Sequence, residues 1–207
     1  MRQQNRQHWE KIWSAADPRE VTWYQDSPEV SLGLIEATGI GHEARILDVG
    51  CGASTLVDGL FDRGFENISM LDLSGSALSH AKARLGDRSE QVTWMIGNVT
   101  TFRMKEPIDL WHDRAVLHFL IEESDRKRYA RTLSDSLAPN GHVIIATFAL
   151  DGPKKCSGLE VLRYGPREIT GLLGESFQLL ELVHETHLSP GKIEQRFTYF
   201  RLQRQQK

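Results

Sequence analysis

The chain has 207 residues, of which 40% are hydrophobic and 26% charged, and its formal net charge is −3. This length suits a single domain, 1–207, and the near-neutral charge indicates no general affinity for nucleic acid or anionic membranes. The N-terminus lacks the apolar segment of a signal peptide and no run of about 18 apolar residues occurs, so we expect a cytoplasmic protein without a membrane partner. The two cysteines lack metal-ligand spacing, so we expect no metal site.

The first part of the chain predicts two short helices joined by an aromatic loop. The apolar face of the first helix consists of Trp9, Ile12 and Trp13. Pro18 should end this helix, and the aromatic loop 21–24 follows. Ser27 is expected to cap a second helix, which opens with Pro28 and ends at Gly39.

Strands and helices then alternate. The predicted strands span 44–49, 68–72, 91–96, 108–113 and 143–148, and the helices between them include 54–63, one that stops at Gly86 and one that starts near Ser124. A turn is predicted at 139–141, and Pro166 opens a further helix. The last predicted strand is continuously apolar, as expected for a strand covered by helices on both faces.

The end of the chain interrupts this alternation. Residues 177–187 and 194–202 predict two long strands joined by a turn at 189–192. Such a hairpin is antiparallel, so one of its strands must run against the parallel sheet. We therefore predict a doubly wound α/β domain with an antiparallel C-terminal hairpin.

The segment 46–55 predicts a buried strand, a tight turn and the start of a helix. Gly50 and Gly52 permit a sharp turn and close approach of a ligand, because glycine has no Cβ atom. Asp72 ends the next strand twenty residues after Gly52 (72 − 52), a spacing typical of a carboxylate that accepts hydrogen bonds from ribose hydroxyls. Thr55 occupies the third glycine position of the dinucleotide pattern, so a nucleoside without pyrophosphate fits better than a dinucleotide.

Together these features resemble the class I S-adenosylmethionine-dependent methyltransferases over residues 40–202. The motifs that carry the resemblance are 48–52, Asp72, 97–99 and the final hairpin. The resemblance implies a mostly parallel, Rossmann-like seven-stranded sheet with S-adenosylmethionine as the cofactor. It also implies that Gly50 and Gly52 contact the methionine part of the cofactor, while Asp72 holds the ribose. Asn98 and Val99 would border the adenine, although the family often has Asp at position 98.

The segments 8–13 and 21–24 resemble a narrower group, which includes small bacterial methyltransferases related to thiopurine methyltransferases and some protein-lysine methyltransferases. In that group an N-terminal helix and an aromatic loop cover the cofactor, so 1–39 would form a cover and 40–207 the core. An aromatic face beside a sulfonium contributes about 0.5–2 kcal/mol; burial in an ordinary helix face is the alternative for the tryptophans. The predicted cofactor residues are Trp13, Trp23, Asp48, Gly50, Gly52, Asp72, Leu73, Asn98, Val99 and Asp113.

The candidates for catalysis follow the fourth predicted strand. His112 and Asp113 end that strand, and either one could orient the cofactor or the nucleophile. His118 has apolar neighbours and could act as a base near neutral pH; the alternative is a core histidine bonded to backbone. Amino methyltransferases that act on nucleic-acid bases usually have Asn or Asp, two prolines and an aromatic residue here. The sequence of 112–115 departs from that pattern, which argues against a base-amine substrate.

The segment 151–164 is a long connection and predicts a lid over the substrate pocket. Arg163 would hold an anionic group of the substrate, and Tyr164 would line the pocket. With Tyr24 and His118 they complete the predicted substrate site.

We expect methyl transfer by in-line displacement to a small molecule with a nitrogen, oxygen, sulfur or metalloid nucleophile. The alternatives are a protein-lysine methyltransferase, a non-catalytic nucleoside-binding module and a nicotinamide oxidoreductase. Thr55 and the C-terminal hairpin disfavour the last of these.

Overall fold

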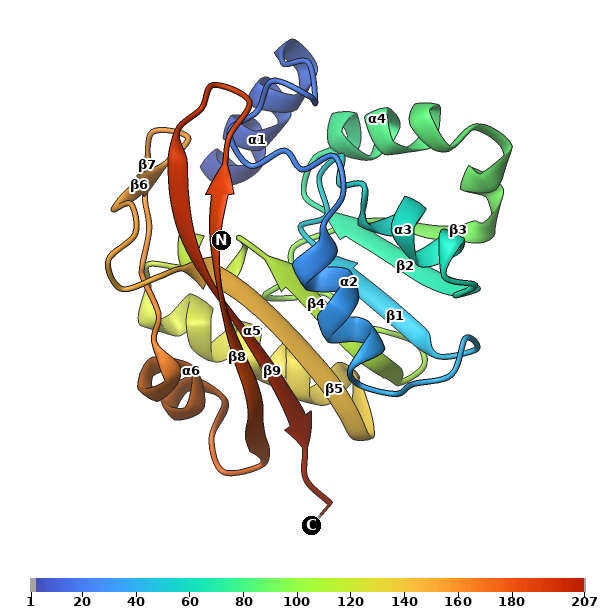
Figure 1. Cartoon of the computed structure of the whole chain (residues 1–207), viewed down its shortest axis with the longest axis vertical. Coiled ribbons are helices and arrows are strands. Elements are labelled where there is room, and N and C mark those ends of the chain that lie inside the picture. Colours follow the sequence, from blue (N-terminus) through green and yellow to red (C-terminus); the bar gives the residue numbers. More distant parts are fainter. Residues whose placement is uncertain (1–2, 207) are drawn as a thin grey trace.

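The computed structural model describes residues 3–206. Its main sheet has seven strands in the order β3-β2-β1-β4-β5-β9-β8 (Figure 1). These strands are β1 (Arg45–Val49), β2 (Asn67–Asp72), β3 (Val92–Ile96), β4 (Ile108–Arg114), β5 (Leu137–Phe148), β8 (Phe177–Leu188) and β9 (Glu194–Arg204). Strands β1 to β5 pair in parallel, and β9 runs antiparallel to both of its neighbours. The predicted doubly wound sheet with its C-terminal hairpin is confirmed.

Helices cover both faces of this sheet (Figure 1). The apolar residues of α2 (Glu29–Glu36), α3 (Leu56–Asp62) and α4 (Gly75–Leu85) pack in one core cluster, and those of α5 (Glu123–Ser136) and α6 (Pro166–Leu173) pack in another. Alternate residues of the central strands enter the two clusters, which explains why the segments 46–47 of β1 and 143–146 of β5 are continuously apolar. There are also two 3-10 helices, η1 (Gly86–Gln91), which has no buried residue, and η2 (Leu117–Phe119), whose Leu117 and His118 are buried. No helix within 3–206 is both long and apolar enough to cross a membrane.

The winding of the sheet reverses between β1 and β4, which are hydrogen-bonded neighbours. At the carboxyl edge of the sheet Val49 pairs with Asp113, and Phe148 of β5 pairs with Phe197 of β9. Because β9 is antiparallel, its first residues lie at the edge where the parallel strands end. Ligands of open α/β sheets bind at such a reversal point.

Two local predictions differ from the structure. Ser27 does not cap α2: its hydroxyl donates to the Glu29 carboxylate, and Pro28 occupies the N-cap position. Strand β5 starts at Leu137 rather than at Val143, so the predicted turn 139–141 lies within it. The pairing register with β4 shifts there, and Asn140 adopts φ 61°. The residues 139–141 therefore form an irregularity within strand β5 and do not form a turn between a helix and a strand.

Helix α1 (Gln3–Ala15) and the loop 16–28 are attached to two separate parts of the core. Glu10 accepts a hydrogen bond of 2.5 Å from Ser76 of α4, and the Trp13 carbonyl lies 2.8 Å from His80 Nε2. On the other side, the Thr22 carbonyl lies 2.9 Å from His187 Nε2 of β8. We call residues 6–28 the N-terminal cover.

Candidate functional site

The turn after β1 requires glycine at two positions. Gly50 and Gly52 have φ values of 58° and 55°, in the left-handed region that L-residues rarely adopt. A Cβ atom on Gly50 would lie 2.0 Å from Val116 Cγ2, and one on Gly52 would lie 2.7 Å from Trp13 Cζ2. The turn is therefore packed closely between the segment after β4 and the N-terminal cover.

A cavity opens beside this turn, with about 1190 Å³ of empty space that includes its mouth. It is bounded by the carboxyl ends of the strands, the N-terminal cover and the start of β9. The predicted cofactor residues that line it are Trp13, Trp23, Asp48, Gly50, Gly52, Asp72, Leu73 and Val99. Tyr24, predicted for the substrate, and His112, predicted for catalysis, also line it. Sequence reasoning thus located the main body of the cavity.

Asp72 is the buried carboxylate at the end of β2. Its two oxygens accept hydrogen bonds of 2.8 Å from the backbone N–H groups of Gly52 and Ser74. Burial raises the pKa of Asp72 to about 6, against the lowering effect of those two N–H donors. A carboxylate has about four acceptor positions, so Asp72 retains acceptor capacity beyond these backbone donors. Asp72 therefore both fixes the glycine turn and offers acceptors to hydroxyl groups in the cavity.

The raised pKa of Asp72 would make the ribose contact that the resemblance implies depend on pH. Below about pH 6 the carboxyl is protonated and loses acceptor capacity, so the affinity for S-adenosylhomocysteine should rise as the pH increases through 6. One pH unit below the pKa, about a tenth of the groups are ionised, so we expect roughly tenfold weaker binding at pH 5 than at pH 7.5. Calorimetry at the two pH values measures this ratio. In Asp72→Asn the affinity should no longer change with pH. If the affinity of this variant still changes with pH, the titrating group is not Asp72.

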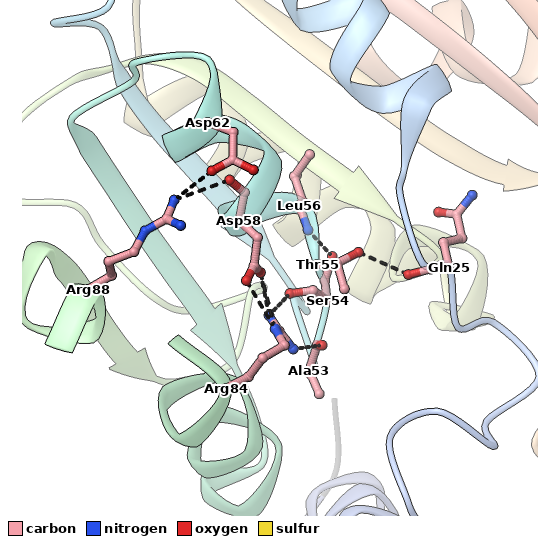
Figure 2. A network of polar contacts seen from close by, with 9 residues as sticks. All are labelled: Gln25, Ala53, Ser54, Thr55, Leu56, Asp58, Asp62, Arg84 and Arg88. Atoms are coloured by element: carbon pink, nitrogen blue, oxygen red, sulfur yellow. Dashed lines mark hydrogen bonds and ion pairs between the residues drawn. The ribbon is translucent and has the colours of Figure 1, made fainter. Parts of the chain in front are cut away.

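Arg84 of α4 holds the glycine turn from outside the cavity (Figure 2). Its guanidinium donates to the carbonyl oxygens of Ala53, at 2.6 Å, and Ser54, at 2.5 Å. The guanidinium also forms an ion pair with Asp58 at 2.8 Å, so it is held between the turn and α3. We call this arrangement of Arg84, Asp58, Ala53 and Ser54 the arginine clamp. These contacts connect the turn to both α3 and α4.

Asp48 and His112 form a buried pair in the cavity wall. His112 Nδ1 lies 2.7 Å from Asp48 Oδ1, and His112 Nε2 lies 2.9 Å from Ser31 Oγ. Both ring nitrogens are thus engaged, and the chain of contacts links β1, β4 and α2. Neither ring nitrogen is free to take a proton from a substrate. We therefore interpret His112 as a residue that positions the ends of β1 and β4.

Asp113 points away from the cavity, contrary to expectation. Its carboxylate accepts hydrogen bonds from the backbone N–H groups of Val116, at 2.8 Å, and Leu117, at 3.1 Å, and from Tyr129 Oη at 2.6 Å. Burial raises the pKa of Asp113 to about 6, although Tyr129 and the backbone donors lower it. Asp113 is not among the residues that line the cavity. The structure thus places it in the support of the 114–117 turn.

His118 is completely buried behind the cavity wall. Its ring lies against Phe119 and Phe148, with centroid distances of 4.4 and 4.9 Å, and neither ring nitrogen has a hydrogen-bond partner. Burial and the charge of Arg114 lower the pKa of His118 to about 3. A base for chemistry near neutral pH needs a pKa closer to 7. This environment is that of a neutral core side chain.

Replacing His118 with leucine should stabilise the protein. The change removes two unpaired polar nitrogens from the core, which is worth about 1–2 kcal/mol in the free energy of unfolding. For a chain of this size, each kcal/mol raises the melting temperature by about 2–4 °C. Because the folded-state pKa is depressed, His118 also lowers stability as the pH falls from about 6.5 towards 3, and the variant should lose that acid sensitivity. Thermal unfolding at pH 7.5 and pH 5 tests this, with the exposed His42→Leu as control; a lower melting temperature in His118→Leu would contradict it.

Three further predicted residues lie outside the cavity lining. Arg163 donates to the Leu150 carbonyl at 2.6 Å, so its charge secures the lid backbone. Tyr164 is buried in the core cluster of α5 and α6, where burial raises its pKa to about 12. Asn98 accepts hydrogen bonds from the Thr100 backbone N–H and hydroxyl, at 3.0 and 2.9 Å. The lid itself contains a small hairpin of β6 (Lys155–Cys156) and β7 (Leu159–Glu160), which sequence reasoning did not predict.

Six of the lining residues that sequence reasoning missed gather on the side of the cavity near β4, β5 and β9. They are Arg114, Phe119, Phe148, Cys156, Gln195 and Phe197. The alternation of side chains along β9 could have identified some of them, because residues 195, 197 and 199 share one face of the strand. Their position beside Arg114 follows only from the pairing of β9 with β5.

The strand order, the glycine turn and the buried Asp72 are features that the resemblance to S-adenosylmethionine-dependent methyltransferases implied. Residues 46–141 match the family described as "Methyltransferase domain". An "eEF1A lysine and N-terminal methyltransferase" of Danio rerio is 24% identical over 146 residues, covering 69% of this chain and 21% of that protein. "Nodulation protein S" of Rhizobium tropici is 24% identical over 114 residues, covering 55% of this chain and 47% of that protein. The chain thus spans less than half the length of these relatives.

Solved structures support the same fold. The N-methyltransferase NodS of Bradyrhizobium japonicum, in complex with S-adenosylhomocysteine, superposes with a TM-score of 0.72 at 18% identity, over 97% of this chain and 98% of that one. The glycopeptide N-methyltransferase MtfA, also with S-adenosylhomocysteine, gives a TM-score of 0.68 at 15% identity, over 92% and 94% of the two chains. At these identities the likeness shows the fold.

Proposed function

We propose that the protein transfers the methyl group of S-adenosylmethionine to a nucleophilic atom of a small molecule. The observation that carries this proposal is one continuous cavity that joins the glycine turn and Asp72 to an aromatic region at β4, β5 and β9. A nucleoside cofactor and an acceptor molecule can thus lie in contact under the N-terminal cover. The names of the relatives and neighbours include a methyltransferase of protein lysine and one of glycopeptides, so the cavity under the N-terminal cover is what favours a small acceptor.

The residues present fit the cofactor. Gly50 and Gly52 allow close approach to the turn, and Asp72 retains acceptor positions for ribose hydroxyls. Trp13 and Trp23 pack edge to face, with ring centroids 5.9 Å apart, and both line the cavity. When bound, S-adenosylmethionine supplies an activated methyl group on a sulfonium.

The protein's part in this chemistry is position and environment. Alignment of two reactants supplies roughly 7–11 kcal/mol of a bimolecular barrier. The arginine clamp and Asp72 fix the turn on one side, and the Asp48–His112 pair fixes the ends of β1 and β4. The N-terminal cover limits the access of water. We assign no general base, because His112 has both nitrogens engaged and His118 lies outside the cavity lining.

Calorimetry and a methyl-transfer screen test the proposal. S-adenosylmethionine and S-adenosylhomocysteine should bind at micromolar concentrations, whereas NAD should not. Methyl-labelled S-adenosylmethionine incubated with a small-metabolite extract, and separately with lysate protein from which metabolites were removed, should label the metabolite fraction. Label confined to lysine residues of protein would establish the protein-lysine alternative. Cofactor binding without transfer to either fraction would establish the non-catalytic nucleoside-binding alternative.

A further inference from the structure

Two buried polar atoms in the cavity wall have no hydrogen-bond partner. They are Nη2 of Arg114, at the end of β4, and Oε1 of Gln195, at the start of β9. Gln195 is only 7% exposed, and the Arg114 Nη2 atom is 3.9 Å from the nearest Glu185 oxygen, too far for a hydrogen bond. Buried polar atoms in folded proteins are nearly always paired. A donor and an acceptor left unpaired in one cavity therefore point to a ligand that pairs with both.

The direction of the Arg114 guanidinium is fixed by its other contacts. Nε donates to Tyr199 Oη at 3.0 Å, and Nη1 donates to the Trp23 carbonyl at 2.9 Å. The guanidinium carbon also lies 4.6 Å from the centre of the Phe197 ring. Because Nε and Nη1 already donate to the protein, Nη2 is the guanidinium nitrogen that could donate to a ligand.

The charge of Arg114 is already balanced. Glu185 forms an ion pair with Arg114, at 3.9 Å. The Glu185 carboxylate also accepts hydrogen bonds from Tyr199 at 2.7 Å and from Gln25 at 2.9 Å. A ligand at Nη2 therefore needs an acceptor oxygen but not a full negative charge. Gln195 lies two residues from Phe197 on the same face of β9, about 7 Å along the strand. The donor thus lies over the Phe197 ring, and the acceptor belongs to the next residue along the same face of β9.

The remaining walls of this region are aromatic. Trp9 packs on Phe119 with a centroid distance of 4.9 Å, and Phe148 packs on Phe197 at 4.8 Å. All four residues line the cavity. Burial raises the pKa of the Cys156 thiol to about 11, so this neighbour is also neutral. Such walls suit a flat apolar body, and they offer little to a flexible aliphatic chain with a charged end.

We infer that the methyl acceptor is an aromatic small molecule with a carbonyl or carboxylate oxygen that accepts from Arg114 and an N–H or O–H group that donates to Gln195. This inference rests on the proposed function, because it names the acceptor class for that reaction. It assigns Arg114 and Gln195 to substrate recognition.

Binding of simple probes to the S-adenosylhomocysteine complex tests this assignment. Benzamide offers both groups, benzoate offers a charged acceptor, and aniline offers only a donor. Titration followed by calorimetry or ligand-observed NMR should show benzamide or benzoate binding at least tenfold more tightly than aniline. Tighter binding of benzamide would identify the oxygen as a carbonyl, and tighter binding of benzoate would identify it as a carboxylate.

Two variants separate recognition from folding. Gln195→Leu should weaken benzamide about fivefold, the effect of one net hydrogen bond, while S-adenosylhomocysteine binds as before. Arg114→Lys keeps the positive charge but removes the planar guanidinium with its several N–H donors. This variant should bind both benzamide and benzoate more weakly. Gln178→Leu, the same change at an exposed position of β8, is the matched control.

The outcomes distinguish this inference from the proposed function. Equal binding of the three probes, binding of none of them to a protein that binds S-adenosylhomocysteine, or an unchanged benzamide affinity in a folded Gln195→Leu variant would overturn the inference alone. Failure of S-adenosylhomocysteine itself to bind would overturn the proposed function.

Discussion

Asp72→Ala should reduce the affinity for S-adenosylhomocysteine by roughly 10- to 150-fold, because hydrogen bonds to a charged group contribute about 1.5–3 kcal/mol. The substitution removes the carboxylate that would accept from the ribose. It also leaves the Gly52 and Ser74 N–H groups without their acceptor, so the glycine turn loses a support. Calorimetry at pH 7.5 gives the dissociation constants of both proteins.

Two controls accompany this measurement. Asp62→Ala removes an exposed carboxylate that pairs with Arg88 outside the cavity, and it should leave the affinity unchanged. Asp72→Asn keeps the size of the side chain, so a loss of affinity there reports the carboxylate and not a gap in packing. An affinity for Asp72→Ala within twofold of the parent would remove Asp72 from the cofactor site.

Asp113→Ala should lower the free energy of unfolding by about 3–5 kcal/mol, because three buried donors lose their acceptor together. Those donors are the backbone N–H groups of Val116 and Leu117 and the hydroxyl of Tyr129. At about 2–4 °C per kcal/mol, the melting temperature should fall by roughly 6–20 °C. Thermal unfolding with and without S-adenosylhomocysteine measures the change.

The matched control for Asp113 is Asp135→Ala, an exposed aspartate on α5 that should change stability by less than about 0.5 kcal/mol. Asp113→Asn should be milder than the alanine variant, because the amide keeps one acceptor oxygen. A catalytic Asp113 would give the opposite pattern: a stable Asp113→Ala protein that binds the cofactor and transfers no methyl group.

The fold was predictable because its signals are local. Gly50 and Gly52 mark the turn after β1, alternating apolar segments mark the strands, and the turn 189–192 marks the hairpin. The start of β5 was mispredicted since the residues 139–141 have the composition of a turn that ends an element. In the structure they accommodate a register shift inside a strand.

The residues that line the cavity at the glycine turn were predictable from the sequence, and those at β4, β5 and β9 were not. Alternation along β4 correctly separates His112 from Asp113, but helices cover both faces of the sheet, so the sequence does not tell which residue meets the cavity. Arg114 and Gln195 are 81 positions apart (195 − 114) and come together only through strand pairing. Sequence reasoning chose Arg163 and Tyr164 from the lid because long connections are often functional. In the structure Arg163 secures the lid backbone, and Tyr164 packs in the core.

The N-terminal cover has a kinetic consequence. It is joined to α4 through Glu10 and Trp13, to β8 through Thr22, and to the glycine turn through Thr55, whose hydroxyl donates to the Gln25 carbonyl at 3.0 Å. If the proposed cofactor binds under this cover, these bonds would slow its release, because such covers open on microsecond to millisecond timescales. We expect product release to limit turnover, so a rapid-quench experiment should show a burst of one methyl transfer per protein before the slower steady state.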